Sequence, residues 1–384
     1  MHGMSRLRPL GAAAMVAGSA VLLPIGAPAE AAPATCHGVR ATKVGTPKAN
    51  LLGTRGRDVI VSNGARQVRT NGGDDLVCIT GGAEEVEVQG DDGDEKVYVE
   101  TRRSSVSYDG ELGSDTFVGS GNGDWVYLRL DGDDRVSTGG GDDDVELRQA
   151  ANRGKVRVTL GSGDDAFHVS AARMRGVVDG GTGSDTLSLV HDSKHGWVFD
   201  NREGRATSQG KTRFRWKQMD YFPLELFDAP SLAFVGGDGP ETVVHQDSAD
   251  ETPTFMFAMG GGDDLIEVSS HGHGSMDGGP GVDRVVFGVN DSQGLLSLVA
   301  DLAAHTAFVD YETGRDYSWM ISGLEQVHAY AFPTVTLRGD DSDNLLIGGG
   351  GNDTLVGNGG TDTADGSSGS DSCDAEVETA CELP

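Results

Sequence analysis

Four consecutive units near the carboxyl end decide the fold, and they read GDDSDNLLI (339–347), GGGGNDTLV (348–356), GNGGTDTAD (357–365) and GSSGSDSCD (366–374). Each unit begins with Gly, carries Asp or Asn at its sixth position, and has a small or apolar residue at its eighth. Gly permits a tight turn, Asp supplies a hard oxygen suited to Ca²⁺, and the eighth residue begins a short strand that faces a core. Two such units therefore form one coil of two strands and two turns.

These units resemble the nonapeptide G-G-x-G-x-D-x-U-x of the repeats-in-toxin (RTX), or hemolysin-type calcium-binding, family. GGTGSDTL (180–187) and GGPGVDRV (278–285) have the same form. The opening CHGVRAT (36–42) through RDVI (57–60) is similar to secreted members from high-GC Gram-positive bacteria. The resemblance implies an all-β, right-handed parallel β-roll or β-helix solenoid with short strands, and Ca²⁺ bound in Gly/Asp-rich turns.

The sixth position can be followed through most of the chain in steps of roughly one nonapeptide. The candidate calcium ligands are Asp58, Asp75, Glu95, Asp115, Asp124, Asp134, Asp143, Asp165, Asp185, Glu241, Asp264, Asp283, Asn344, Asp353, Asp362 and Asp371. Because alternate turns lie on opposite edges of a solenoid, the N-terminal series splits in two. One edge is acidic from Asp58 to Asp134 and then has Gly154 and Arg175, whereas the other has Arg66, Glu84 and Ser104 before its acids begin at Asp124. We expect calcium capacity to change edges partway along the stack.

Composition excludes several classes of protein. The chain has 384 residues with 59 Gly, 60 Asp or Glu, and 30 Lys or Arg, which gives a formal charge of −30. Gly is about twice its average usage of about 7%, but no G-X-Y period exists, so collagen is excluded. The negative electrostatic potential of such a chain repels nucleic acid and anionic membranes, and it favours cations as partners.

The first 31 residues predict a secretory signal peptide, because a basic start is followed by an apolar run and by the small-x-small site AEA at 29–31. A membrane anchor is the alternative, although the run is interrupted and short, and no later apolar run could cross a bilayer. Secretion favours two disulfides, Cys36–Cys78 and Cys373–Cys381, over free or metal-bound thiols.

Two interruptions divide the repeats. We expect repeats at 32–190, an enlarged coil at 191–235, repeats at 236–285, a second enlarged coil at 286–338, and a terminal block at 339–384 with a disulfide-capped tail. Each interruption follows a complete GGxGxD unit and contains one tryptophan, Trp216 or Trp319. The first is basic and aromatic, so it could bind an acidic glycan or pack against the acidic stack.

Catalytic signatures are absent from the sequence, which contains neither an HExxH nor a GxSxG motif. We therefore expect no enzymatic activity, and a secreted protein with a structural or adhesive role that needs calcium to fold. Candidate partners are a cell-surface glycan or a protein. The alternative is a polysaccharide-binding or polysaccharide-modifying β-helix, similar to lyases and epimerases, which clustered Lys, Arg, His and Asp around residues 195–220 would favour.

Overall fold

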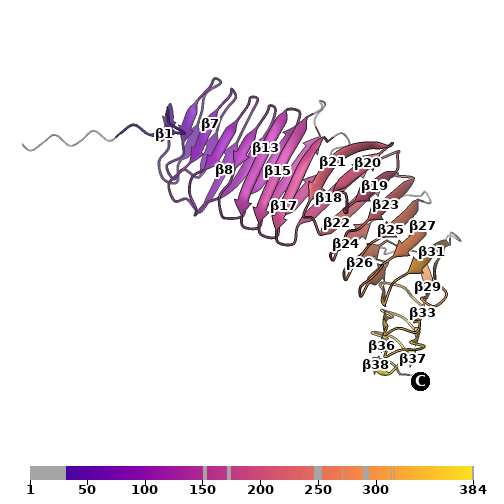
Figure 1. Ribbon diagram of the computed structural model, residues 1–384. Helices are drawn as coiled ribbons and strands as arrows, with labels where there is room; N and C mark the ends of the chain where they lie inside the picture. The colour runs from indigo at the N-terminus through magenta and orange to yellow at the C-terminus, as the bar shows by residue number, and fades with distance from the viewer. Residues whose placement is uncertain are drawn as a thin grey trace, which may run out of the picture. The chain divides into compact units, whose positions relative to one another are not determined.

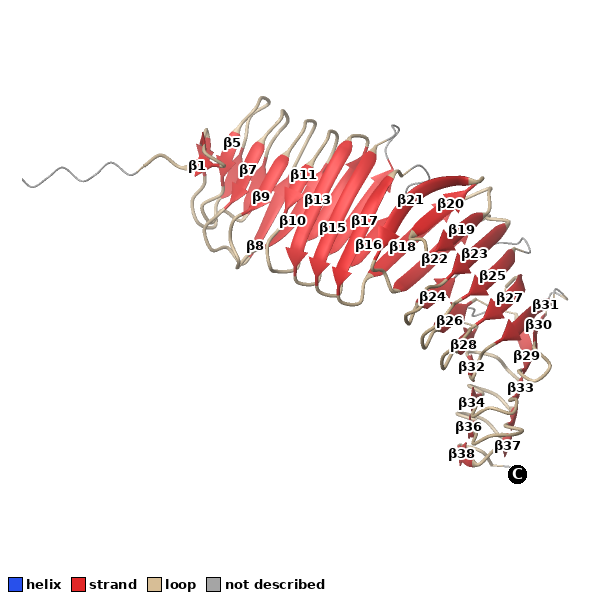
Figure 2. Cartoon of the chain, in the orientation of Figure 1, coloured by secondary structure: helices blue, strands red, loops and turns tan. Residues whose placement is uncertain are grey.

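The computed structural model describes residues 32–149, 154–170, 174–245, 253–269, 271–288, 294–312, 314 and 316–382. The expected signal peptide at 1–31 lies outside these ranges. Residues 34–384 form one compact unit, distinct from residues 1–33. All regular structure in the described ranges is β-strand (Figure 2). The expected all-β solenoid is confirmed, with about fifteen turns.

One wall of the solenoid is a parallel sheet of sixteen strands, which we call the first sheet (Figure 1). Its strands, in spatial order, are β4 (Asn50–Leu52), β6 (Gln67–Arg69), β8 (Glu85–Gln89), β10 (Ser105–Gly110), β12 (Trp125–Leu130), β14 (Asp144–Gln149), β16 (Ala166–Val169), β18 (Thr186–Asp192), β22 (Tyr221–Phe227), β24 (Thr242–His245), β26 (Leu265–Val268), β28 (Arg284–Phe287), β32 (Gln326–Ala329), β34 (Leu345–Ile347), β36 (Thr363–Asp365) and β38 (Val377–Thr379).

The opposite wall, the second sheet, is formed mainly by the strands that alternate with these along the chain. They are β3 (Lys43–Val44), β5 (Val59–Val61), β7 (Leu76–Ile79), β9 (Lys96–Val99), β11 (Thr116–Val118), β13 (Asp133–Gly140), β15 (Lys155–Ser162), β17 (Gly176–Thr182), β23 (Ser231–Val235), β25 (Thr254–Ala258), β27 (His273–Asp277), β33 (Val335–Arg338), β35 (Thr354–Val356) and β37 (Ser372–Asp374). A separate antiparallel pair, β1 (Thr35–Cys36) and β2 (Val39–Arg40), precedes them.

The two interruptions insert the same motif into the second sheet. In the first, β19 (Trp197–Asp200), β20 (Arg205–Ser208) and β21 (Lys211–Lys217) form an antiparallel meander, with β21 against β17 and β19 against β23. In the second, β29 (Leu295–Asp301), β30 (Thr306–Tyr311) and β31 (Tyr317–Ser322) repeat this arrangement between β27 and β33. Each interruption therefore adds two strands to the second sheet, and the parallel stacking of coils continues beyond it.

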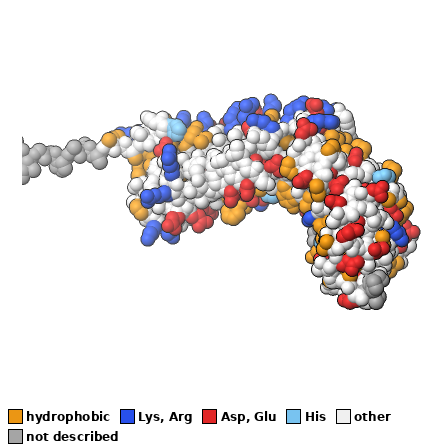
Figure 3. All heavy atoms as spheres, turned by 60° about the horizontal axis from the view of Figure 1, so that its bottom comes forward, with side chains coloured by type: hydrophobic (Ala, Val, Ile, Leu, Met, Phe, Trp, Pro, Cys, Tyr) orange, Lys and Arg blue, Asp and Glu red, His pale blue; other side chains and the backbone are white. Residues whose placement is uncertain are grey.

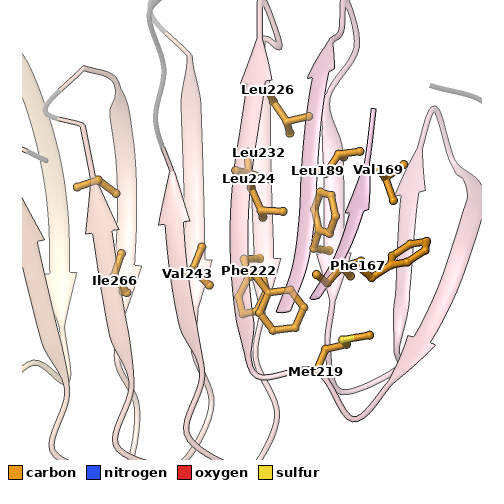
Figure 4. Close-up of a cluster of buried hydrophobic side chains, with 14 of the residues drawn as sticks. Phe167, Val169, Leu189, Met219, Phe222, Leu224, Leu226, Leu232, Val243 and Ile266 are labelled. Atoms are coloured by element: carbon orange, nitrogen blue, oxygen red, sulfur yellow. The ribbon is translucent and has the colours of Figure 1, made fainter. Parts of the chain in front are cut away.

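Side chains of equivalent strand positions stack in inward-facing columns. In the first sheet one column runs through Val126, Val145, Phe167 and Leu187, which are register partners on successive strands and at most 2% exposed. Figure 4 shows part of this interior, around Phe222. Each such side chain contributes about 1.5–3 kcal/mol when it is removed from water. The repeated columns supply the stability that no single short strand could provide.

The basic and aromatic residues of the first interruption separate onto opposite faces. On β21, Phe214 and Trp216 are buried while Arg215 and Lys217 are exposed, because successive strand residues point to opposite sides. Trp216 packs on Phe222, with the ring centres 6.0 Å apart. The aromatic residues thus belong to the core, and the bases remain at the surface.

The two faces of β25 allow a matched test of the core. Phe257 is 1% exposed and its neighbour Met256 is 49% exposed. We expect Phe257→Ala to lower the free energy of unfolding by about 3–5 kcal/mol, because a buried ring leaves a cavity. Met256→Ala should change it by less than about 0.5 kcal/mol. Urea unfolding of both variants in the same buffer checks this, and equal losses would contradict the assigned faces.

Candidate metal sites

The sixteen predicted ligands all lie at the turns of the solenoid, at or just before the start of a strand, and none is more than 5% exposed. Those that precede strands of the second sheet form the first edge, namely Asp58, Asp75, Glu95, Asp115, Asp134, Asp353 and Asp371. Those that precede strands of the first sheet form the second edge, namely Asp124, Asp143, Asp165, Asp185, Glu241, Asp264, Asp283, Asn344 and Asp362. Burial of acidic side chains on this scale requires partners.

One carboxylate oxygen of most of these residues has a backbone partner in the preceding coil. The N–H of Asp124 donates to Oδ1 of Asp143 at 2.7 Å, and the N–H of Asp143 donates to Oδ1 of Asp165 at 2.8 Å. The same bond joins Asp353 to Asp371 in the terminal block, at 2.8 Å. A ladder of N–H to carboxylate bonds therefore ties each turn to the next.

In most of these residues the second carboxylate oxygen has no hydrogen-bond partner. Asp58 is an exception, because its Oδ1 accepts from Thr42 and its Oδ2 accepts from Thr54. Buried oxygens without a hydrogen bond in the described part of the chain include Oδ2 of Asp75, Asp124, Asp134, Asp143, Asp165, Asp185, Asp264, Asp283, Asp353, Asp362 and Asp371, Oε2 of Glu241, and both carboxylate oxygens of Glu95. A buried, unpartnered carboxylate oxygen is costly unless it meets a cation. Hard oxygens in regular columns are the donor set that Ca²⁺ prefers, so these residues fit a calcium ion.

The first Gly of a unit lies beside this unpartnered oxygen. A Cβ at Gly348 would lie 2.6 Å from Oδ2 of Asp353, and a Cβ at Gly180 would lie 2.5 Å from Oδ2 of Asp185. Any larger residue would occupy the space that the carboxylate oxygen and a bound cation need. This explains why the repeat requires Gly at position one as well as Asp at position six.

Burial and mutual repulsion raise the pKa of several of these carboxyl groups. At Asp58 the effect of burial is outweighed by hydrogen bonds from Thr42 and Thr54, and the pKa is lowered. Burial raises the pKa of Glu95 to about 9, and the neighbouring charges of Asp115 and Asp75 add to the shift. Burial is also the largest cause of the rise in the pKa of Asp115 and of Asp143, each to about 7. Without a cation the folded chain thus favours the protonated form, whereas a bound cation would favour the carboxylate.

Sequence spacing missed four acids that extend the columns. The N–H of Asp185 donates to Oδ2 of Asp220 at 3.1 Å, and the N–H of Asp283 donates to Oε2 of Glu325 at 2.8 Å. Glu376 and Glu382 accept the corresponding bonds from Asp362 and Asp371, each at 2.9 Å. All four fall outside the nine-residue period. An acid placed one or two residues before a strand would have been the signal for Asp220 and Glu325.

A second, outer ladder lies one residue before the buried one and was also missed. Its members are exposed, as in the bond from the N–H of Asp164 to Oδ1 of Asp142 at 3.0 Å and that from the N–H of Ser184 to Oδ1 of Asp164 at 2.9 Å. The outer acids add negative charge around the buried oxygens. They are therefore additional candidates to hold or attract a cation.

The buried acids pass from the first edge to the second along the stack, and both edges carry them between Asp115 and Asp143. On the first edge they end at Asp134, and the following turns have Gly154 and an exposed Arg175. On the second edge Arg66 and Glu84 are exposed, and the ladder begins with Asp124, whose Oδ1 accepts the N–H of Val106. Acids occupy both edges again in the terminal block. Which of these positions hold calcium stays a prediction.

Disulfides close both ends of the described stack. Cys36 is bonded to Cys78 and Cys373 to Cys381, with Cα atoms 5.5 Å and 5.9 Å apart. The first joins the β1–β2 pair to the second sheet, and the second fastens the tail to the terminal block. In the described ranges, no helix is long and apolar enough to span a membrane.

Comparison with known families identifies the terminal block. The RTX calcium-binding nonapeptide repeat family matches residues 338–373 in four copies. These copies are the units in which Asn344, Asp353, Asp362 and Asp371 lie. No curated protein matches the chain. The chain therefore carries RTX repeats, and the ladder described above extends the geometry of those repeats toward the N-terminus.

Two glycines of one repeat allow a matched test of the site. A Cβ at Gly348 would collide with the carboxylate of Asp353, whereas a Cβ at Gly350 meets nothing within 4 Å. We expect Gly348→Ala to raise the calcium concentration at the folding midpoint by about threefold or more, because site geometry sets calcium affinity. Gly350→Ala should leave it nearly unchanged. Calcium titrations followed by circular dichroism measure both, and an equal response would argue against a site at this glycine.

The raised pKa values predict an unusual pH dependence for the calcium-free chain. A carboxyl group whose pKa is raised by folding stabilises the folded state below its unfolded pKa of about 4, and this stability is lost as pH rises through the folded pKa. For Asp143 and Glu95 the loss spans pH values from about 4 to about 7 and 9 respectively. In calcium-free buffer, the folded fraction measured by far-UV circular dichroism should therefore be higher at pH 4 than at pH 8. A higher folded fraction at pH 8 would show that these groups are not buried as described.

Proposed function

We propose that the chain is a secreted calcium-binding repeat protein, in which calcium ions bind between coils and are required for folding. The observation that carries this proposal is the column of buried carboxylate oxygens that lack any partner in the described part of the chain. The match of residues 338–373 to a calcium-binding repeat supports the choice of ion. When bound, calcium would supply positive charge and oxygen coordination at these positions.

The need for calcium follows from the spacing of the coils. Neighbouring parallel strands are about 4.8 Å apart, so equivalent carboxylates lie nearly in contact along an edge. Two such charges repel by about 1 kcal/mol in bulk water and by several times more at lower dielectric. Summed along a column, this repulsion opposes folding. A divalent cation that binds only the folded chain removes it and adds stability by linkage.

Secretion is supported by three features of the chain. The N-terminal 31 residues have the pattern of a cleaved signal, both pairs of cysteines are oxidised, and RTX repeat proteins are typically secreted. Calcium is present outside cells at concentrations suited to extracellular modules, whose affinities lie at about 10⁻⁴–10⁻³ M. Folding would thus be completed after export.

The role that we propose is structural or adhesive, without enzymatic activity. RTX repeats are generally structural calcium-binding units, and the long outer faces of a solenoid suit contact with a cell-surface glycan or a protein. The alternative of a polysaccharide-modifying enzyme would be supported if uronate polymers were shortened or epimerised during incubation with the full chain and calcium. Unchanged polymers would support the non-enzymatic role.

A single charge removed from the ladder should weaken the response to calcium. Asp165→Asn keeps an oxygen that can accept a hydrogen bond from the N–H of Asp143, but it removes the negative charge. Asn344 is a natural example of an uncharged side chain at this position of the repeat. We expect its calcium midpoint for folding, measured by far-UV circular dichroism, to rise by about three- to tenfold, since ligand charge sets affinity. Asp228→Asn, at an exposed position outside the ladder, is the control. A wild-type chain that is fully folded in chelator and does not respond to millimolar calcium would refute the proposal.

A further inference from the structure

A strongly basic surface interrupts this acidic protein on the outer side of the second sheet. It consists of side chains on β13, β15 and β21 and in the turn before β17, and we call it the basic face: Arg135, Lys155, Arg157, Arg175, Arg213 and Arg215. Arg213 is half-buried and the other five are exposed. Lys and Arg side chains gather in several clusters on the face drawn in the space-filling view, with some Asp and Glu side chains beside them (Figure 3).

Strand register brings these like charges together. Arg135 is the register partner of Arg157 on the next strand, and Val177 alone separates Arg157 from Arg215. Adjacent strands are about 4.8 Å apart, and like charges directly opposite one another are destabilising. Folding alone therefore gives no reason for this arrangement.

Carboxylates near the basic face leave most of it unneutralised. Asp179 forms an ion pair with Lys217, with Oδ2 and Nζ 2.6 Å apart, and Asp133 is the register partner of Lys155. Among the described residues, Arg135, Arg157 and Arg215 make no ion pair with Asp or Glu. The face begins at the coil of Asp134, the last buried acid of the first edge before the terminal block, so the acid ladder of that edge does not continue under the rest of the face.

Two pockets lie against side chains of the basic face. One, of about 350 Å³, is lined by Arg135, Lys155, Arg157 and Arg175 together with Asp133, Asp134, Val156, Gly176 and Val177. The other, of about 370 Å³, is lined by Arg175, Lys211 and Arg213, among others. Arg175 lines both pockets, so they adjoin at this side chain. No Asp or Glu is among the described residues that line the second pocket.

We propose that the basic face binds a linear acidic polysaccharide, with its acid groups laid across successive coils. A linear polymer with regularly spaced negative charges suits a row of Lys and Arg side chains that repeats at the coil spacing. Arg forms bidentate hydrogen bonds with carboxylate or sulfate groups. Single-stranded nucleic acid is less suited, because proteins that bind it stack the bases on exposed aromatic rings. The exposed large apolar residue within the face is Val177, and the rings of Phe214 and Trp216 point into the core.

The formal charge of −30 gives the chain as a whole a repulsive potential for an acidic polymer, so the polymer would be oriented by the row of Lys and Arg side chains that it contacts. The basic face meets the calcium ladders only at Asp134, which lines one of its pockets, and the proposal does not depend on the occupancy of the ladders.

Binding of labelled oligogalacturonate to the full chain, followed by fluorescence anisotropy at constant millimolar calcium, tests the proposal. The triple variant R135Q/R157Q/R215Q should bind at least tenfold more weakly than the wild type. The matched control, R129Q/R148Q/R284Q, removes three charges from the first sheet and should bind within twofold of the wild type. Labelled dextran oligomers of the same length, which are neutral, should not bind.

Three results would overturn the proposal: an unchanged affinity in the triple variant, an equal loss in the control, or tighter binding of a single-stranded oligonucleotide than of oligogalacturonate. Circular dichroism of each variant verifies the fold. If the triple variant does not fold, R157Q alone replaces it, with an expected loss of about threefold, and an affinity equal to that of the wild type would then count against the basic face.

Discussion

Parallel stacking of coils at about 4.8 Å is the constraint on which the rest of the structure depends. It places equivalent residues of successive coils directly above one another, so every choice of side chain is repeated as a column. An apolar choice gives a continuous core, as in the column through Val145 and Phe167. An acidic choice gives a column of like charges, as from Asp124 to Asp185. The same geometry therefore stabilises the apolar column, and it destabilises the acidic column unless a cation binds between its carboxylates.

The two kinds of charged column occupy different parts of the second sheet and its edge. Along the first edge, buried acids extend as far as Asp134, and the bases Lys155, Arg157 and Arg175 follow immediately. The second edge carries the acid ladder past both inserted meanders, because Asp220 and Glu325 take the ladder position there. One stack can thus hold cations along one edge while it presents positive charge to solvent on a neighbouring face.

Sequence periodicity could predict the coil and the edge of each acid, because these depend on local spacing and on parity. Both disulfides could be predicted from the expected secretion and from the placement of two cysteines near each end of the chain. It could not place Asp220 or Glu325, since the meanders before them add residues that break the nine-residue step. Nor could it separate Arg215 from Trp216, which are adjacent in sequence but point to opposite sides of β21. The unpartnered oxygens became visible only in three dimensions, because the partner of each first oxygen lies a full coil away, as for Asp165 and Asp143.

Anomalous diffraction from crystals of the full chain grown with calcium would show whether calcium ions occupy the turns. Peaks are expected between adjacent turns, next to Oδ2 of residues such as Asp143, Asp165 and Asp353, which have no hydrogen-bond partner in the described part of the chain. Peaks should be absent beside Gly154 and Arg175. Water or protein atoms at the Oδ2 positions, with no calcium peak along either edge, would contradict this expectation.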